Sequence, residues 1–167
     1  GKDGDFFTSV STSSFFGGSI AKKIIASIED GFLPSNTTIL EIGAHHGYLL
    51  ADIIQFIYTL KPELLQTLNF TIVERFENLQ KEQKKYLFDS FGDSIKLKHY
   101  NDINEVKLEN AYVLANEIFD AFSCDLVYTN KEGTLQQGFV SNHKIEFIDC
   151  TDENIINHCK KYSITKG

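Results

Sequence analysis

The residues with the clearest capacity for chemistry lie between Thr38 and Tyr48, where the chain reads Thr-Ile-Leu-Glu-Ile-Gly-Ala-His-His-Gly-Tyr. A short β-branched and apolar run leads to the acidic Glu41, then to Gly43 and Gly47. Glycines let the backbone turn sharply and approach a ligand, and a helix that begins after the second glycine presents unpaired N–H groups. The pattern is typical of a nucleotide-type cofactor held at the carboxyl edge of a parallel sheet.

The spacing of these residues distinguishes two classes of cofactor. A dinucleotide fingerprint has the form G-x-G-x-x-G, and two glycines separated by three residues do not match it. An acidic residue two positions before the first glycine is what methyltransferase loops place near the methionyl ammonium of S-adenosylmethionine. We therefore predict that this cofactor contacts the loop residues Glu41, Gly43, Ala44, His45 and Gly47. The alternative is a strand–loop–helix connection that binds no ligand.

A second carboxylate follows the next apolar run. Glu74 comes directly after residues 68–73, at the expected carboxyl end of a strand. There its two oxygens could accept both ribose hydroxyls of an adenosine group. The alternative is a solvent-facing strand end, but Glu41, two glycines and Glu74 in this order form a stronger signal than any one of them.

A third polar group is the segment Asn116-Glu117-Ile118-Phe119-Asp120-Ala121, which follows a later apolar run. Ligands of open α/β sheets bind at this edge, so we expect Asn116, Glu117 and Asp120 beside the methyl donor. They could orient a cationic nucleophile such as arginine, which stays protonated and must be aligned. In the alternative, Asn116 caps a helix whose dipole favours the acidic residues.

Histidines and cysteines give no metal signature. The adjacent His45 and His46 cannot present their rings to one ion in regular geometry, and no cysteine or third histidine lies nearby. Cys124, Cys150 and Cys159 form no Cys-x-x-Cys pair, which indicates reduced thiols in a reducing compartment. We expect no metal and a cytoplasmic location.

Composition sets the remaining limits. The chain has 167 residues, 42% of them hydrophobic and 23% charged, which is typical of one globular domain. Its net charge of −7 argues against a nucleic-acid partner and suits a cationic substrate. No run is long enough to span a bilayer and no signal peptide is evident. The absence of any Met leads us to expect that one or both ends are truncated.

The apolar pattern predicts strands alternating with helices, typical of a Rossmann-like, doubly wound and mostly parallel α/β sheet. The expected helices run from residue 13 or 14 to about 30, from 47 to 60, from 77 to 88 and from 152 to 162. The expected parallel strands are 38–42, 68–73, 95–99 and 111–115, and a β-meander follows at 126–129, 135–140 and 144–148. Within a single domain we assign residues 1–122 to the cofactor-binding core, 123–150 to the meander and 151–167 to a helix and tail.

Five segments of the chain occur together in one known family. They are Gly4-Asp5-Phe6-Phe7-Thr8-Ser9, Phe16-Gly17, Leu40-Glu41-Ile42-Gly43, Ile72-Val73-Glu74 with Leu79 and Gln83, and Asn116-Glu117-Ile118-Phe119-Asp120-Ala121. Together they resemble the MidA-like methyltransferases, relatives of the mitochondrial complex I assembly factor that is a protein arginine methyltransferase. The resemblance extends from Gly4 to about Val140, and its first and last motifs are the most specific.

The resemblance implies a class I S-adenosylmethionine-dependent fold and a bacterial member of that family. Its cofactor would contact Gly43, Gly47 and Glu74, and the segment containing Thr8 and Ser9 would fold over the site. The implied reaction is methyl transfer to a protein nitrogen, an arginine guanidinium, with a respiratory complex I-type subunit as one candidate substrate. No membrane insertion is implied.

Two departures from the family pattern bear on activity. The family loop reads Gly-x-Gly-x-Gly, and His45 replaces its central glycine. If that position needs a positive φ, a histidine there costs on the order of 1–3 kcal/mol or blocks the cofactor. The family also continues beyond both ends of this chain. The leading hypothesis is an active methyltransferase; the alternatives are a catalytically degenerate assembly or binding factor of the same fold and, least favoured, a dehydrogenase-like enzyme.

Overall fold

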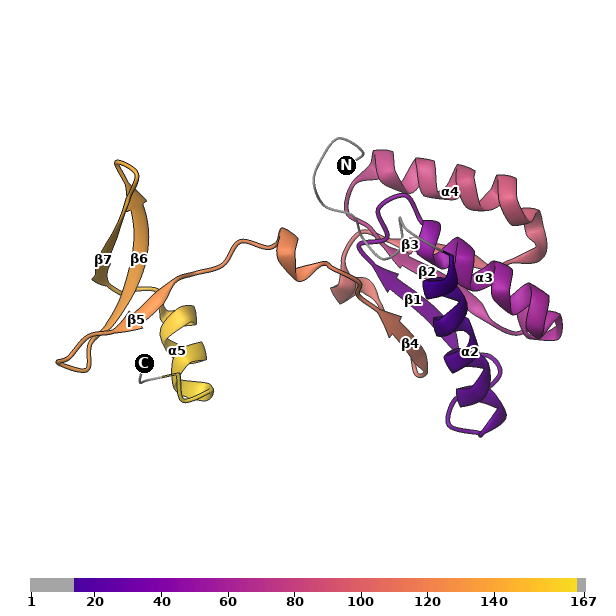
Figure 1. Cartoon of the computed structure of the whole chain (residues 1–167), viewed down its shortest axis with the longest axis horizontal. Helices are drawn as coiled ribbons and strands as arrows, with labels where there is room; N and C mark the ends of the chain where they lie inside the picture. The colour runs from indigo at the N-terminus through magenta and orange to yellow at the C-terminus, as the bar shows by residue number, and fades with distance from the viewer. Residues whose placement is uncertain (1–13, 165–167) are drawn as a thin grey trace. The chain divides into compact units, whose positions relative to one another are not determined.

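The computed structural model describes residues 14–164, and for Ala121 its backbone alone. The chain divides into two compact units, Gly1–Asp120 and Ala121–Gly167, and each unit is described by itself. Figure 1 labels the helices and strands of both. In chain order, the elements of the first unit are α2 (Phe15–Glu29), β1 (Thr38–Ile42), α3 (Tyr48–Leu60), η1 (Pro62–Gln66), β2 (Asn69–Val73), α4 (Glu77–Phe91), η2 (Gly92–Ser94), β3 (Leu97–Tyr100), η3 (Ile103–Glu105), β4 (Ala111–Leu114) and η4 (Phe119–Ala121), the last of which ends one residue into the second unit.

The first unit contains a four-stranded parallel sheet with the strand order β3-β2-β1-β4. This arrangement confirms the predicted fold class of strands alternating with helices. In the register, Ile39 of β1 lies between Phe70 of β2 and Tyr112 of β4. Strands β2 and β3 extend the sheet on one side of β1, and β4 extends it on the other side, so the strand order reverses at β1. Such a switch point is where open α/β sheets place their ligands.

The predicted boundaries are close to the observed ones, with two notable differences. Helix α4 continues to Phe91 rather than Phe88, because nothing before Gly92 interrupts the helical backbone. Gly92 then takes a positive φ of 56° and ends the helix. Strand β3 begins at Leu97 rather than Ile95, because the chain still bends at Ile95 after the 3-10 turn η2.

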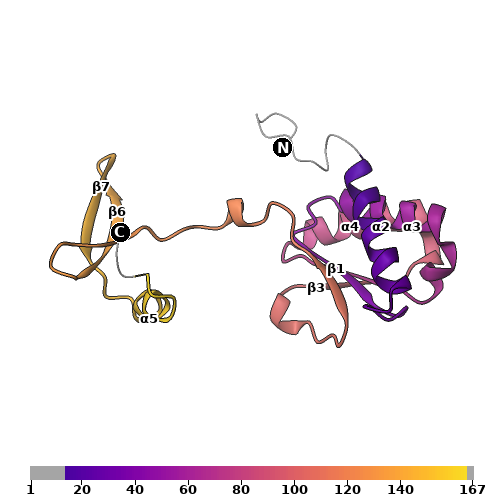
Figure 2. The same ribbon diagram turned by 60° about the horizontal axis from the view of Figure 1, so that its bottom comes forward.

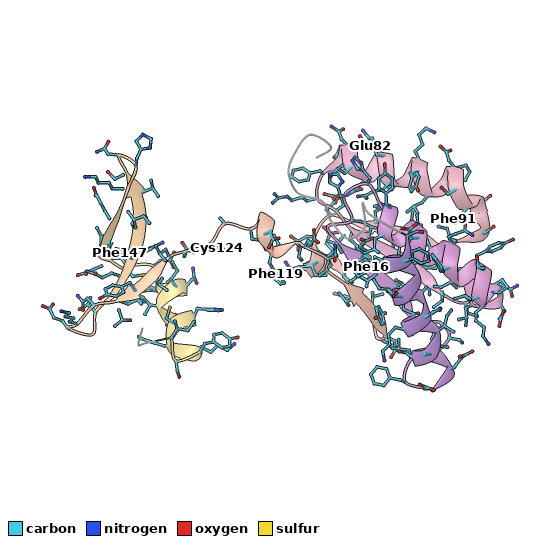
Figure 3. The ribbon with its side chains drawn as sticks, viewed as in Figure 1. Phe16, Glu82, Phe91, Phe119, Cys124 and Phe147 are labelled. Atoms are coloured by element: carbon cyan, nitrogen blue, oxygen red, sulfur yellow. The ribbon has the colours of Figure 1, made fainter. Side chains whose placement is uncertain are left out.

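Three helices and the sheet share one hydrophobic core. Figure 2 shows α2, α3 and α4 together on one side of the strands. Phe16 of α2 and Phe91 of α4, both labelled in Figure 3, pack against this core. Its fully buried large apolar side chains come from all of these elements: Ile24, Ile39, Leu50, Ile53, Ile54, Ile57, Leu68, Phe70, Ile72 and Leu87. Alternate strand residues point to the other face, where Val113 of β4 is 54% exposed.

Helix α2 crosses α3 at unusually short range, because two glycines lie at the crossing. A Cβ atom added to Gly17 would lie 2.5 Å from Cβ of Asp52, and one added to Gly18 would lie 2.7 Å from the Phe56 ring. A larger side chain at Gly17 would require the helices to separate, whereas one at Gly18 would displace the Phe56 ring. Packing alone therefore accounts for Gly17, one of the residues on which the family resemblance rests.

The second unit is an antiparallel meander followed by a helix. Strands β5 (Val127–Thr129), β6 (Leu135–Ser141) and β7 (Lys144–Asp149) pair in that order, and α5 spans Glu153–Lys161. The two-residue turn Asn142-His143 has positive φ at both positions, which matches the twist of a tight hairpin. Asp152 begins α5 by accepting hydrogen bonds from the backbone N–H groups of Asn154 and Ile155. The predicted meander and terminal helix are thus confirmed.

Candidate functional site

The candidate site lies at the carboxyl ends of β1, β2 and β4. Because these strands are adjacent and parallel, the residues that follow each of them meet at one edge of the sheet. The glycine loop follows β1, Glu74 follows β2 and the segment 115–120 follows β4. The topology therefore brings the three predicted groups together. Thr8 and Ser9 lie outside the described residues.

The glycine loop is a tight left-handed turn. Gly43 and Gly47 have φ values of 68° and 80°, in the region that favours glycine. The N–H of Gly47 donates to the carbonyl of Ala44 at 2.7 Å, and the N–H of Gly43 donates to the carbonyl of Val73 at 3.2 Å. The loop is thus joined to the end of β2, and α3 begins directly after it with Gly47 as its N-cap.

His45 adopts the left-handed conformation as well, with a φ of 49°. The condition under which we expected a histidine to be strained at this position is therefore met, and the strain is on the order of 1–3 kcal/mol. Partial burial, and then the neighbouring His46 ring, lower the pKa of His45, while the charges of Glu74 and Glu82 act in the opposite direction.

Glu41 is buried beneath the loop, with 4% of its surface exposed. Burial raises the pKa of its carboxyl from 4.5 to about 7, and the backbone N–H of Leu50 opposes that shift. Its Oε2 atom accepts no hydrogen bond within residues 14–164. The one identified partner, Leu50, lies in the first turn of α3, so Glu41 already has a structural role at this helix start. Contact with a methionyl ammonium remains a prediction.

Glu74 is also buried, and one of its oxygens accepts a hydrogen bond just before α4 begins. Its Oε1 accepts a hydrogen bond from the N–H of Phe76 at 3.0 Å, and its own N–H donates to the carbonyl of Tyr100 at 2.9 Å. The alternative of a solvent-facing strand end is wrong, because Glu74 is 6% exposed. Acceptance of ribose hydroxyls by this carboxylate remains a prediction.

The segment after β4 lies against the glycine loop. A Cβ atom added to Gly43 would lie 3.0 Å from Cγ2 of Ile118, closer than most Cβ contacts, and the φ of 68° also favours glycine there. Asn116 is half-buried, and both Glu117 and Asp120 are exposed. Residues 115–121, all with a described backbone, contain no α-helix for Asn116 to cap, so that alternative is wrong. The structure thus leaves the carboxylates of this segment available next to the loop.

The chemistry of these groups suits S-adenosylmethionine. Two left-handed glycines leave backbone free of Cβ atoms at the loop, and the N-terminus of α3 follows directly. Buried and exposed carboxylates adjoin a loop that carries no lysine or arginine. This acidic surrounding favours a ligand with a positively charged sulfonium and ammonium. The residues present therefore fit the cofactor.

Two buried glutamines of α4 complete the site, and neither was predicted as a site residue. Nε2 of Gln83 donates to the carbonyl of His45 at 2.7 Å, and Nε2 of Gln80 donates to the carbonyl of Glu74 at 2.6 Å. The sequence signal that could have found them is helical spacing. Gln80, Gln83 and Leu87 follow one another at intervals of three and four residues, which places them on one face of the helix.

Neither a metal site nor a membrane span is found in the described part of the chain. Within residues 14–164 no three His, Cys, Asp or Glu side chains are grouped closely enough to hold a metal ion. The His45 and His46 rings meet edge to face with centroids 4.0 Å apart. Over the same residues, no helix combines the length and apolarity needed to cross a bilayer.

Comparison with known proteins agrees with this fold. The model of a family described as "Putative S-adenosyl-L-methionine-dependent methyltransferase" matches residues 19–164. A methyl transferase candidate from Burkholderia thailandensis, crystallised with S-adenosyl-homocysteine, is 20% identical with a TM-score of 0.66 over 93% of this chain and 40% of its own. A native crystal structure from the same organism gives 20% identity and a TM-score of 0.66, over 94% and 41% of the two chains. The chain thus spans about two-fifths of the length of these structures. No curated protein sequence matches it.

Proposed function

The chain belongs to the S-adenosyl-L-methionine-dependent methyltransferase family whose model matches residues 19–164, and on that premise we propose that it forms the cofactor-binding part of a protein arginine methyltransferase. The observation that carries the proposal is the close approach of Ile118 to Gly43, by which the segment Asn116–Asp120 adjoins the glycine loop. The arginine preference and the MidA-like assignment are supported by the motif that contains Asn116, Glu117 and Asp120.

In this proposal each part of the edge has one task. The backbone of Gly43, Ala44 and Gly47 receives the methionyl part of the cofactor, and Glu74 accepts hydrogen bonds from its ribose. When bound, the cofactor supplies an electrophilic methyl group on a positively charged sulfur. Glu117 and Asp120, which are exposed, attract a guanidinium and align one nitrogen for in-line transfer. That nitrogen would gain the methyl group as the sulfur–methyl bond breaks and S-adenosyl-homocysteine is left, and it would release one proton, which the carboxylates of the segment could accept.

Binding is tested by titrating the chain with S-adenosylmethionine and S-adenosyl-homocysteine in a calorimeter. Glu74→Gln keeps one oxygen for the Phe76 N–H but replaces the other acceptor by a donor. Since hydrogen bonds to a charged group contribute about 1.5–3 kcal/mol, we expect affinity to fall roughly 10- to 100-fold. Glu109→Gln, an exposed change in the loop before β4, is the matched control and should leave affinity unchanged. The absence of heat at millimolar ligand would refute the binding proposal.

The substrate class requires a separate test. The chain and the cofactor are incubated with peptides that differ only in carrying arginine or lysine, and methylation is followed by mass spectrometry. Selective methylation of arginine supports the proposal, and a respiratory complex I-type subunit is then the candidate protein to try first. Methylation of lysine alone, with arginine unmodified, would contradict the arginine assignment while leaving cofactor binding intact.

The second candidate, a catalytically degenerate binding factor, is favoured by the strained His45 alone. It is tested by His45→Gly. If the native loop accepts the cofactor, this change should alter affinity by less than about threefold, since the backbone conformation is already that of a glycine. Binding seen only after His45→Gly would identify the native chain as the degenerate form.

A further inference from the structure

Gln83 is an amide at the centre of an otherwise ordinary helix–sheet contact. It is fully buried, and Leu87 lies one turn later on the same face of α4. A buried amide is unfavourable unless its hydrogen-bonding groups are satisfied, whereas a leucine or methionine in the same space needs no partner. The polar side chain therefore indicates a directional task that apolar packing cannot perform.

The nitrogen and the oxygen of the Gln83 amide both have hydrogen-bond partners, one in the loop after β1 and the other on β3. Nε2 donates to the backbone carbonyl of His45 at 2.7 Å, and Oε1 lies 3.1 Å from Nε2 of His99 on β3. The His45 carbonyl can only accept, so the amide nitrogen must face it and the amide oxygen must face His99. His99 then carries a proton on Nε2. Burial, and then the charge of Lys84, lower the pKa of His99 to about 4, so the ring is neutral at pH 7 and its tautomer is fixed by this contact.

The same side chain also lies close to the second glycine of the loop. A Cβ atom added to Gly47 would lie 3.6 Å from Cγ of Gln83. Gln83 thus packs beside the start of α3 while its amide holds the carbonyl of His45. The residue that it holds is His45, whose left-handed backbone, with φ of 49°, is uncommon for residues other than glycine.

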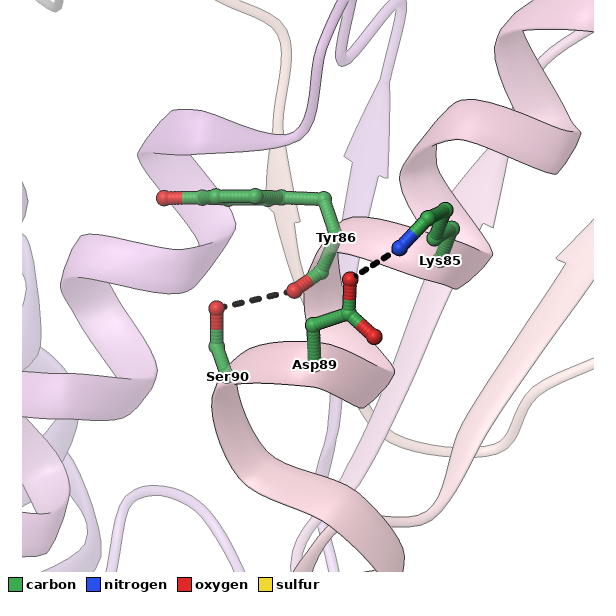
Figure 4. A network of polar contacts seen from close by, with 4 residues as sticks. All are labelled: Lys85, Tyr86, Asp89 and Ser90. Atoms are coloured by element: carbon green, nitrogen blue, oxygen red, sulfur yellow. Dashed lines mark hydrogen bonds and ion pairs between the residues drawn. The ribbon is translucent and has the colours of Figure 1, made fainter.

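Gln80, one turn earlier, makes an analogous pair of contacts at the next strand. Its Nε2 donates to the carbonyl of Glu74 at 2.6 Å and to Oδ1 of Asn101 at 2.8 Å. Helix α4 therefore holds the residues that follow β1, β2 and β3 with two amides. Its outer face differs: there Lys85 pairs with Asp89 along the helix, and Oγ of Ser90 donates to the carbonyl of Tyr86, as Figure 4 shows.

We propose that Gln83 is a positioning residue of the cofactor loop, which holds the carbonyl of His45 and thereby keeps the loop in the left-handed turn that receives the cofactor. The inference rests on the proposed function and adds to it a residue that touches neither cofactor nor substrate. The hydrogen bond from Gln83 stabilises the left-handed backbone at residue 45, which a glycine would adopt without such support.

The test uses the 167-residue chain and Gln83→Met, which keeps the length of the side chain and removes both hydrogen bonds. Gln55→Met, an exposed change on α3, is the matched control. In the ligand-free protein we expect amide hydrogen exchange of residues 44–48 to accelerate about tenfold in Gln83→Met, with the exchange of β1 and β2 unchanged. S-adenosyl-homocysteine should bind about tenfold more weakly to Gln83→Met and equally well to the control.

A second background distinguishes positioning from a general loss of packing. In His45→Gly the loop no longer needs a hydrogen bond to hold a strained residue, so Gln83→Met should weaken binding there by less than about threefold. Equal losses with His45 and with glycine, or loop exchange that does not change, would overturn the proposal. If no variant and no native chain binds the ligand, the proposed function fails, and the exchange measurements still decide whether Gln83 holds the loop.

If Gln83→Met does not fold, the native chain provides the readout by NMR. The proposal requires slowly exchanging Nε2 protons on Gln83 and an Nε2–H tautomer of His99, seen in the ring nitrogen shifts. An Nδ1–H tautomer, or side-chain amide protons of Gln83 that exchange as fast as those of exposed glutamines, would overturn it.

Discussion

Helices α3 and α4 pack on the same face of one parallel sheet, yet they bury different kinds of side chain. The buried residues of α3 are all apolar: Leu49, Leu50, Ala51, Ile53, Ile54 and Ile57. Those of α4 are Gln80, Gln83 and Leu87. Apolar burial stabilises in proportion to area and has no preferred direction, whereas a buried amide must be aimed at a partner. The comparison teaches that α3 mainly holds the fold together and α4 mainly fixes the loops at the edge of the sheet.

The largest expected effect is on the apolar side of the comparison. Ile54 is fully buried, so Ile54→Ala should lower the free energy of unfolding by about 2–5 kcal/mol, measured by urea denaturation. Tyr58→Ala, an exposed position on the same helix, should change it by less than about 1 kcal/mol. If Ile54→Ala lowers the free energy of unfolding no more than Tyr58→Ala does, the conclusion that α3 mainly holds the fold together is wrong.

Glu41 bears on the comparison because α3 also has a polar contact: the backbone N–H of Leu50, in its first turn, hydrogen-bonds to the Glu41 carboxyl. Its folded pKa of about 7 lies above the ordinary 4.5, so its contribution to stability is complete below pH 4.5 and is lost as the pH rises through 7. The shift corresponds to a loss of about 3 kcal/mol in the free energy of unfolding across that window. Urea denaturation of the native chain and of Glu41→Gln at several pH values measures it. The variant should lack this part of the pH dependence, and identical pH profiles would contradict the prediction.

The short distance between α2 and α3 gives the next effect. Gly17→Ala would place a Cβ atom 2.5 Å from Cβ of Asp52, so the two helices must separate. Overpacking of this kind costs about 1–3 kcal/mol, measured as a lower urea midpoint. Ser19→Ala, an exposed change on the same helix, serves as the control. A glycine-to-alanine change that raised stability, as helix propensity alone predicts, would show that the crossing is looser than described.

On the polar side, Gln80→Met removes two hydrogen bonds and should lower the free energy of unfolding by only about 1–2 kcal/mol, because each contributes about 1 kcal/mol net. The same change frees the carbonyl of Glu74, so we expect faster hydrogen exchange at residues 74–76 than elsewhere on the sheet edge. This smaller loss of stability, combined with a local change at the edge, is the signature expected of α4. A loss as large as that of Ile54→Ala would erase the distinction between the helices.

The smallest effect belongs to the outer face of α4. Asp89→Ala removes the exposed ion pair with Lys85 and should change the free energy of unfolding by about 0.3–0.5 kcal/mol. High salt should reduce the difference between the native chain and the variant, because it screens the pair. A difference that does not depend on salt would mean that Asp89 acts through something other than this pair.

Much of this fold could be predicted because apolar spacing and chain breakers act locally. The run 38–42 is β1 with the expected bounds, and the helix after Gly47 ends before Pro62 as expected. The three polar groups of the candidate site could be brought together in advance because parallel strands end at one edge. The family's central glycine at position 45 indicated that the backbone there could need a positive φ, and the φ of His45 is 49°.

What could not be predicted depends on contacts between distant residues. Helix α4 is rich in charged residues, and its spacing places both of its glutamines on the buried face without naming the groups that they contact. Only the packing of α4 against the loop at residue 45 gives Gln83 its partner, 38 positions away in the chain. Likewise, the role of Gly17 follows from the distance between two helices rather than from its own neighbours in sequence.

The lowered pKa of His45 has a consequence for the electrostatics of the loop. Partial burial and the adjacent His46 ring keep the imidazole uncharged at neutral pH. An uncharged ring does not repel a ligand that carries positive charge on sulfur and nitrogen, whereas a lysine or arginine at this position would. In acid the same ring becomes a cation and would compete with such a ligand for the nearby carboxylates. The side chain that replaces a glycine here is thus electrostatically compatible with a cationic guest.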